Sequence, residues 1–139
     1  MPALPHLDRL DYLERAIRAR REAAGELMSS LAFVADIEML VHDAEAFIDL
    51  VELMDEDHSR VKGGMDEGAR ARYWERIRPE IVGRIRGVLA ALRELVREAV
   101  CIEPAGENVT KVRRPAVPEE YFNRLASRLE EVAGGAGRL

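Results

Sequence analysis

Residues 33–54 read FVADIEMLVHDAEAFIDLVELM, and their apolar side chains recur alternately four and three positions apart. This spacing keeps one apolar stripe on one side of an α-helix and is typical of helices that pack lengthwise against other helices. The stripe, called the seam below, consists of Phe33, Ile37, Leu40, Ala44, Phe47, Val51 and Met54. The stretch therefore predicts a long packing helix.

Two other regions carry related patterns. Heptad-spaced apolar residues begin at Leu10, and Gly25 and the Ser29–Ser30 pair interrupt them before the seam resumes. Because Gly and Ser pairs are known kink sites, residues 8–57 form either two helices or, as we favour, one kinked or interrupted helix. A second clean heptad predicts a helix over 66–102, with Pro79 as a kink or a fresh start; it contains Ile81, Ile85, Val88, Leu92, Leu95, Ala99 and Ile102.

The remaining residues complete a single domain over 1–139. Residues 1–6 form a leader, 103–117 lack helical periodicity and predict an extended connector, and 134–139 predict a frayed tail. Between them, Pro118 precedes a short helix over 119–132 with one apolar face. The predicted fold class is all-α: an antiparallel helical bundle of three to four long helices with coiled-coil-like heptad packing and a short C-terminal helix.

Composition limits the functional classes. The chain has 139 residues, of which 47% are hydrophobic and 34% charged, so it can bury a core without disulfides or metals. Its formal net charge of −5 is unlike that of a typical nucleic-acid binder. The single Cys101 allows no intramolecular disulfide, and its apolar neighbours predict a buried thiol at a helix end. Without a signal-peptide pattern or a long apolar run, we expect no membrane association and a cytoplasmic location.

The acidic segment from Asp36 to Asp57 contains the sharpest candidate for a metal site. Carboxylates and one imidazole recur there on a single helical stripe, and such side chains can bind divalent cations. The candidate ligands are Glu38, His42, Glu45 and Asp49, followed along the stripe by Glu52 and Glu56. Because this stripe takes outward heptad positions, we interpret it as an ordinary solvated face and expect no metal or other cofactor.

Arginines flank the apolar stripe of the predicted 66–102 helix. Such flanking charges normally pair with a neighbouring helix, and the acidic 36–57 segment is the obvious partner. Exposed arginines with nearby aromatics could instead contact nucleic acid or an acidic protein. The candidates for that role are Arg72, Arg76, Arg86, Arg93 and Arg97.

A second apolar strip occupies the back of the acidic helix, away from the seam. It consists of Met39, Ala46 and Leu53, which share one heptad position, and the adjacent Leu50. A peripheral helix of a monomer does not need two apolar sides, so this strip predicts an interface with another copy or another protein.

The sequence contains no motif of a catalytic nucleophile and no phosphate-binding loop.

These observations favour a non-catalytic helical interaction subunit that self-associates within a larger assembly. Two alternatives stay open. One is a small nucleic-acid-associated subunit that uses the Arg-rich 70–97 face, and the other is a metal-dependent enzyme on the acidic 38–56 stripe.

Overall fold

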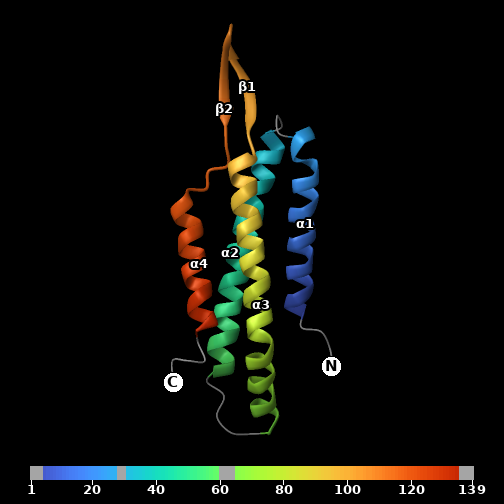
Figure 1. The fold of residues 1–139 in the computed structure, drawn as a ribbon, viewed down its shortest axis with the longest axis vertical. Helices are drawn as coiled ribbons and strands as arrows, with labels where there is room; N and C mark the ends of the chain where they lie inside the picture. The colour runs from blue at the N-terminus through green and yellow to red at the C-terminus, as the bar shows by residue number, and fades with distance from the viewer. Residues whose placement is uncertain (1–4, 28–30, 60–64, 135–139) are drawn as a thin grey trace.

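Four helices and one β-hairpin make up the computed structural model, which describes residues 5–27, 31–59 and 65–134 (Figure 1). The predicted mostly helical fold is confirmed. The first four leader residues, the Ser29–Ser30 pair and the tail beyond Gly134 lie outside the described residues. The elements in chain order are α1 (Pro5–Leu27), α2 (Leu31–Ser59), α3 (Met65–Glu98), β1 (Cys101–Gly106), β2 (Val109–Arg113) and α4 (Glu119–Ala133).

Successive helices run in alternate directions along one long axis (Figure 1). The central pair is α2 and α3, and α1 and α4 flank it, each in contact with both central helices. We call these four packed helices the helical body. The β-hairpin projects from the end of the body where α3 finishes and α4 begins.

The region predicted as one kinked or interrupted helix over 8–57 is two helices that pack against each other antiparallel (Figure 1). Folding back lets both apolar stripes enter one core, which a single bent helix would keep apart. Leu10, Leu13 and Ile17 of α1 are buried together with Phe33 and Ile37 of the seam.

Helix α3 runs from Met65 to Glu98 without a break at Pro79. Pro79 lies on the exposed side of the helix, and so does Glu75, whose carbonyl would otherwise accept the N–H that proline lacks. The second heptad is buried from Ile81 to Ala99, but Ile102 is 55% exposed. The helix ends four residues earlier than predicted, so Ile102 belongs to β1 instead.

The predicted extended connector over 103–117 contains most of the β-hairpin. Antiparallel pairing joins Cys101 to Arg113 and Ile102 to Val112, with a bulge between Pro104 and Gly106. At the turn, Asn108 has a φ of 60°, a conformation that Asn adopts more readily than most residues. The connector therefore extends away from the helical body and returns, rather than crossing it.

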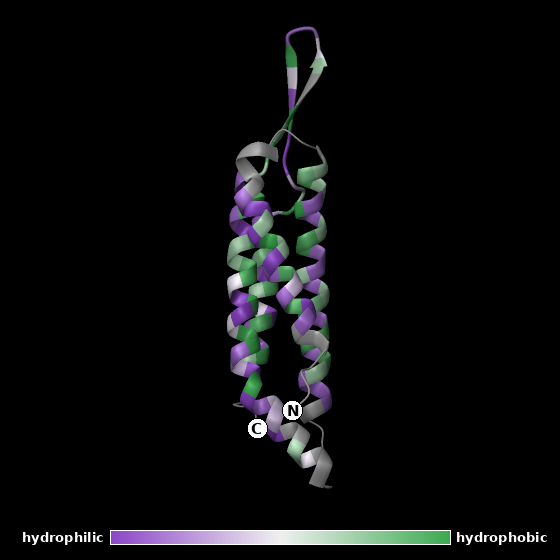
Figure 2. Ribbon diagram, turned by 90° about the vertical axis from the view of Figure 1, so that its right-hand side faces the viewer, coloured by the Kyte–Doolittle hydropathy of each residue, from purple (hydrophilic) through white to green (hydrophobic). Residues whose placement is uncertain are grey.

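Helix α4 begins where the sequence indicates. Pro118 caps it in extended conformation, and Glu119 and Glu120 occupy its first turn, where carboxylates interact favourably with the helix dipole. Its four apolar residues, Phe122, Leu125, Leu129 and Val132, are all buried. They join one cluster of buried apolar side chains to which all four helices contribute. Figure 2 shows hydrophobic residues along these helices and also in the projecting hairpin.

Candidate interaction surface

The second apolar strip of α2 lies on the outside of the helical body. Met39 and Leu53 are each 62% exposed, Ala46 is exposed and Leu50 is half-buried. The seam of the same helix is buried from Phe33 to Val51. Helix α2 therefore has one apolar face in the core and a second apolar face toward solvent.

A groove runs beside this strip, between α1 and α2. Its volume is about 520 Å³, and its walls include Tyr12 and Leu13 of α1 together with Ala46, Leu50 and Leu53 of α2. Tyr12 is 64% exposed, the largest exposed fraction among the large apolar side chains described. Sequence reasoning missed Tyr12, although its place between the buried Leu10 and Leu13 put an aromatic ring just off the heptad stripe of α1.

The charged side chains that line the groove are mainly acidic. Asp8, Asp43 and Asp49 line it, against a single base, Arg9. Asp49 is paired with Arg128 of α4. Within the described part of the chain, Asp8 and Asp43 form no ion pair, so their charges remain available to a partner.

The acidic stripe of α2 turns toward α4 rather than entirely toward solvent. Arg128 donates from Nε to Glu52 at 3.1 Å, contacts Asp49, and lies 3.8 Å from Glu45. Glu38 accepts a 3.2 Å hydrogen bond from the backbone N–H of Ala116, just before α4. Glu38, Glu45 and Glu52 are half-buried, so the interpretation of the whole stripe as a solvated face is corrected for these three residues.

Tyr121 of α4 shares this region. Burial raises the pKa of its hydroxyl, and the neighbouring Glu45 carboxylate raises it further by disfavouring a second negative charge. Both effects favour the neutral hydroxyl, and the Tyr121 side chain packs against the apolar core.

The metal candidates are not gathered into a ligand set. Glu38, Glu45 and Asp49 make the contacts to α4 described above, whereas His42 is exposed. Nowhere in residues 5–27, 31–59 or 65–134 do three His, Cys, Asp or Glu side chains converge in a way that could hold a metal ion.

Four arginines of α3 pair with α4 or α1, whereas Arg78 pairs with Asp55 in the acidic segment of α2. Arg86 binds Glu130 through two hydrogen bonds of 2.5 and 2.6 Å. Arg93 and Arg97 share Glu119, at 2.5 and 3.0 Å. These pairs lower the pKa of both glutamates, because each guanidinium stabilises the ionised carboxylate.

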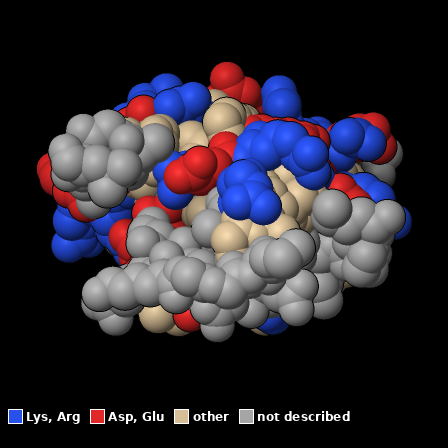
Figure 3. All heavy atoms as spheres, turned by 90° about the horizontal axis from the view of Figure 1, so that it is seen from below, with Lys and Arg blue, Asp and Glu red and all other residues tan. Residues whose placement is uncertain are grey.

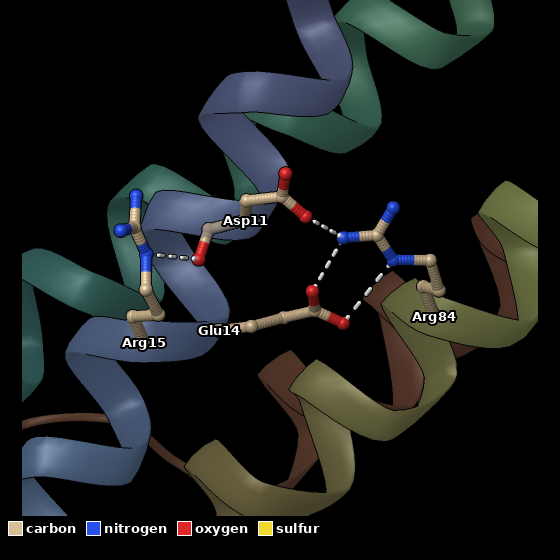
Figure 4. Close-up of polar contacts among 4 residues, drawn as sticks. All are labelled: Asp11, Glu14, Arg15 and Arg84. Carbon is tan, nitrogen blue, oxygen red and sulfur yellow. Dashed lines mark hydrogen bonds and ion pairs between the residues drawn. The ribbon is translucent and has the colours of Figure 1, made fainter.

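The other arginines of that face have different surroundings. Arg84 reaches across to α1, where its guanidinium contacts both Asp11 and Glu14 (Figure 4). Arg76 lies over the ring of Tyr73 at 5.1 Å, and Arg72 is exposed. Seen from the end opposite the hairpin, basic and acidic side chains are interspersed on the described surface (Figure 3).

One ion pair is buried between the central helices. Arg78 lies 2.5 Å from Asp55, with side-chain exposures of 6% and 16%. The indole N–H of Trp74 donates to the same carboxylate at 2.9 Å. Asp55 therefore accepts from two α3 side chains and ties the C-terminal part of α2 to α3.

Comparisons with protein-family models, with curated proteins and with solved structures give no match. No helix within the described ranges has both the length and the apolar character needed to span a membrane.

Proposed function

We propose that this chain is a non-catalytic helical interaction subunit that self-associates, with the groove between α1 and α2 and the adjoining α2 strip as its interface. The observation that carries the proposal is that Tyr12 and Leu53, both more than 60% exposed, line one groove between these two helices, while Met39 is equally exposed at the heptad position of Leu53. Single exposed apolar residues are common on protein surfaces, but a strip that continues into a groove is typical of an interaction site.

The charges around the strip support this assignment. Most arginines of α3 are engaged in ion pairs inside the molecule, whereas Asp8 and Asp43 beside the groove form none within the described residues. An apolar centre with charged groups at its edge is the usual anatomy of a protein–protein interface. The coiled-coil-like seam of α2 serves the internal core, so its opposite side is available to a partner.

The test replaces the apolar strip with charge. Met39→Glu places a carboxylate one turn from Asp43 and Leu53→Glu places one a turn from Asp49. Like charges in a desolvated contact are strongly unfavourable. We expect the wild type to form dimers or larger species at tens of micromolar in sedimentation velocity and light scattering, and the double variant to remain monomeric. Because both side chains are exposed, the unfolding midpoint of the dilute protein should change little.

The matched control adds the same two charges elsewhere. Ala90→Glu with Ala126→Glu alters exposed positions on α3 and α4 and should leave self-association intact. A wild type that stays monomeric over the whole concentration range would contradict the proposal. Unfolding of the Met39 and Leu53 double variant would also contradict it, because the strip would then belong to the core.

A further inference from the structure

The outward face of α2 is poorly suited to pack against a second α2. Between Asp36 and Asp57 the helix carries carboxylates throughout and no Lys or Arg, so two copies of α2 in contact would bring acidic groups together in any register. Asp43 is exposed and lines the groove, and it forms no ion pair with the residues that the structure describes. The interface proposed above therefore needs a helix with an exposed basic group opposite α2.

Helix α1 offers such a group on the same face of the molecule. Arg15 is exposed, and Figure 4 shows it on the side of α1 away from Arg84 of α3. It donates at 3.4 Å to the backbone carbonyl of Asp11 and pairs with no carboxylate in the described part of the chain. Arg15 follows Tyr12 by about one helical turn, and Tyr12 lines the groove.

The apolar side chains of the two helices also have complementary sizes. On α2 the small Ala46 lies between Met39 and Leu53, which are both 62% exposed, so the strip leaves room at its centre. On α1 the large apolar side chain that extends into solvent is Tyr12, 64% exposed. A tyrosine ring from another copy would fit over Ala46 between the two larger side chains.

The two helices place these groups at matching heights. They are antiparallel, and Arg20 of α1 pairs with Asp36 of α2 at 3.4 Å. Arg15 lies five residues before Arg20, so it is level with position 41 of α2 and within about 3 Å of Asp43 along the helix axis. By the same count Tyr12 is level with position 44, two residues from the alanine at the centre of the strip.

A two-fold axis parallel to the helices would satisfy both contacts at once. Rotation about an axis beside the groove keeps every residue at its height and places α1 of one copy against α2 of the other. Such an interface is isologous, because each copy gives the same α1 and α2 surfaces, and it closes as a dimer. Asp8 is also on α1, but Arg9 follows it, so that end of the helix adds no net charge.

We propose that two copies form a two-fold symmetric dimer in which α1 of each lies against α2 of the other, with Tyr12 over Ala46 and with Arg15 paired with Asp43 across the interface. This arrangement rests on the self-association proposed above and names the helices that meet, the symmetry and one charge pair. Four helices, two from each copy, then enclose the strip and the groove.

The experiment reverses the two charges separately in the full chain. Arg15→Glu brings two carboxylates together at each of the two symmetric contacts, and Asp43→Arg brings two guanidiniums together. We expect each variant to associate at least about tenfold more weakly than the wild type in sedimentation velocity. Because both side chains are exposed, helical circular dichroism should be unchanged.

An equimolar mixture of the two variants tests whether these residues meet. In a mixed dimer the introduced glutamate of one variant faces the introduced arginine of the other, and the native Arg15 and Asp43 form the second contact. Both contacts then join opposite charges. The mixture should therefore form a heterodimer about as tightly as the wild type forms its dimer, although each variant alone does not.

The matched control reverses a charge on another side of α1. Arg18 is one turn from Arg15, but it lines the cavity between α1 and α3 together with Gly83 and Gly87. Arg18→Glu should therefore leave association unchanged. A loss as large as that of Arg15→Glu would overturn the arrangement, because the overall charge of α1 would then explain both effects.

Each remaining outcome decides between the arrangement and self-association itself. If Asp43→Arg associates as tightly as the wild type or more tightly, Asp43 does not face a basic group, and the arrangement is overturned while self-association stands. If both variants are weakened and their mixture is not restored, Arg15 and Asp43 do not meet, and the arrangement is again overturned. If the wild type is monomeric, both proposals fail.

Discussion

Arg78 and Asp55 form a buried ion pair between the two central helices, with 2.5 Å between guanidinium nitrogen and carboxylate oxygen. Removing one partner of such a pair leaves the other charge in a site with little water, which typically destabilises a protein by about 3–5 kcal/mol. We expect this loss in the free energy of unfolding for Asp55→Ala, measured by urea denaturation, and Trp74 would also lose a hydrogen-bond acceptor.

The control for this prediction is an exposed ion pair. Arg21 and Glu94 lie 3.3 Å apart with side chains more than half exposed, so Glu94→Ala should change the free energy of unfolding by no more than about 0.5 kcal/mol. Equal effects of the two substitutions would show that burial of the Arg78–Asp55 pair does not govern its contribution.

Leu92 should be among the most sensitive positions in the core. Its side chain is fully buried on α3, and truncating a buried leucine to alanine typically costs about 2–5 kcal/mol through lost apolar contacts and a residual cavity. Denaturation of Leu92→Ala should show that loss, whereas Leu53→Ala, measured in dilute protein, should show a much smaller one. A loss below about 1 kcal/mol at Leu92 would mean that the site collapses to refill the cavity.

Two glycines of α3 offer a gain in stability. A Cβ added at Gly83 or Gly87 would meet nothing within 4 Å, and alanine is favoured over glycine inside a helix by up to about 1 kcal/mol. Thermal and urea unfolding of Gly83→Ala and of Gly87→Ala should therefore show an increase. Gly106→Ala is the opposite control, because its φ of 155° is strained for any residue with a Cβ. Destabilisation at Gly83 or Gly87 would contradict the open space beside α3.

Glu119 should make stability depend on pH. Its hydrogen bond with Arg93 and the nearby Arg97 lower its pKa in the folded chain below the ordinary value of 4.5. The folded state thus binds its proton less readily than the unfolded state, so the stabilisation is complete above 4.5 and disappears as the pH falls below that value.

Comparing Glu119→Gln with the wild type tests this dependence. The wild type should be the more stable protein at neutral pH, and the difference should vanish in acid. Glu120→Gln alters the same first turn of α4 without an ion pair in the described part of the chain, and its effect should vary much less with pH. A difference for Glu119→Gln that persists unchanged in acid would rule out the ion pairs as its cause.

The heptads predicted the helices because apolar spacing alone determines which residues can share a buried face. The same reasoning could not say which helices become neighbours. Arg93 and Arg97 pair with α4, and Arg84 pairs with α1, because the crossing geometry of the helices brings those faces together. The fold-back between α1 and α2 likewise depends on the shared core rather than on any local signal.

The hairpin was missed because its strands carry no burial pattern that sequence could reveal. All of β2 is exposed, so its alternation does not mark a core face. The available signal was a Gly-Glu-Asn turn with β-branched residues on both sides, which favours a hairpin; these residues are Ile102, Val109 and Val112.

The exposed strip of α2 was predicted from the periodicity of its apolar residues. Tyr12 could not be predicted in the same way, because it lies beside that strip only through the packing of α1 on α2.

Each helix of the body packs against the helix that follows it in the chain. The segments that join α1 to α2 and α2 to α3 are short, so little chain entropy is lost when these helices meet, whereas residues 99–118 separate α3 from α4. Proteins dominated by such local contacts reach the native state in about microseconds to milliseconds. The fold should therefore assemble through α2 and α3 as an early helical hairpin, with the flanking helices adding afterwards. A refolding phase that becomes slower when the protein is diluted would then report association of subunits rather than formation of the helical body.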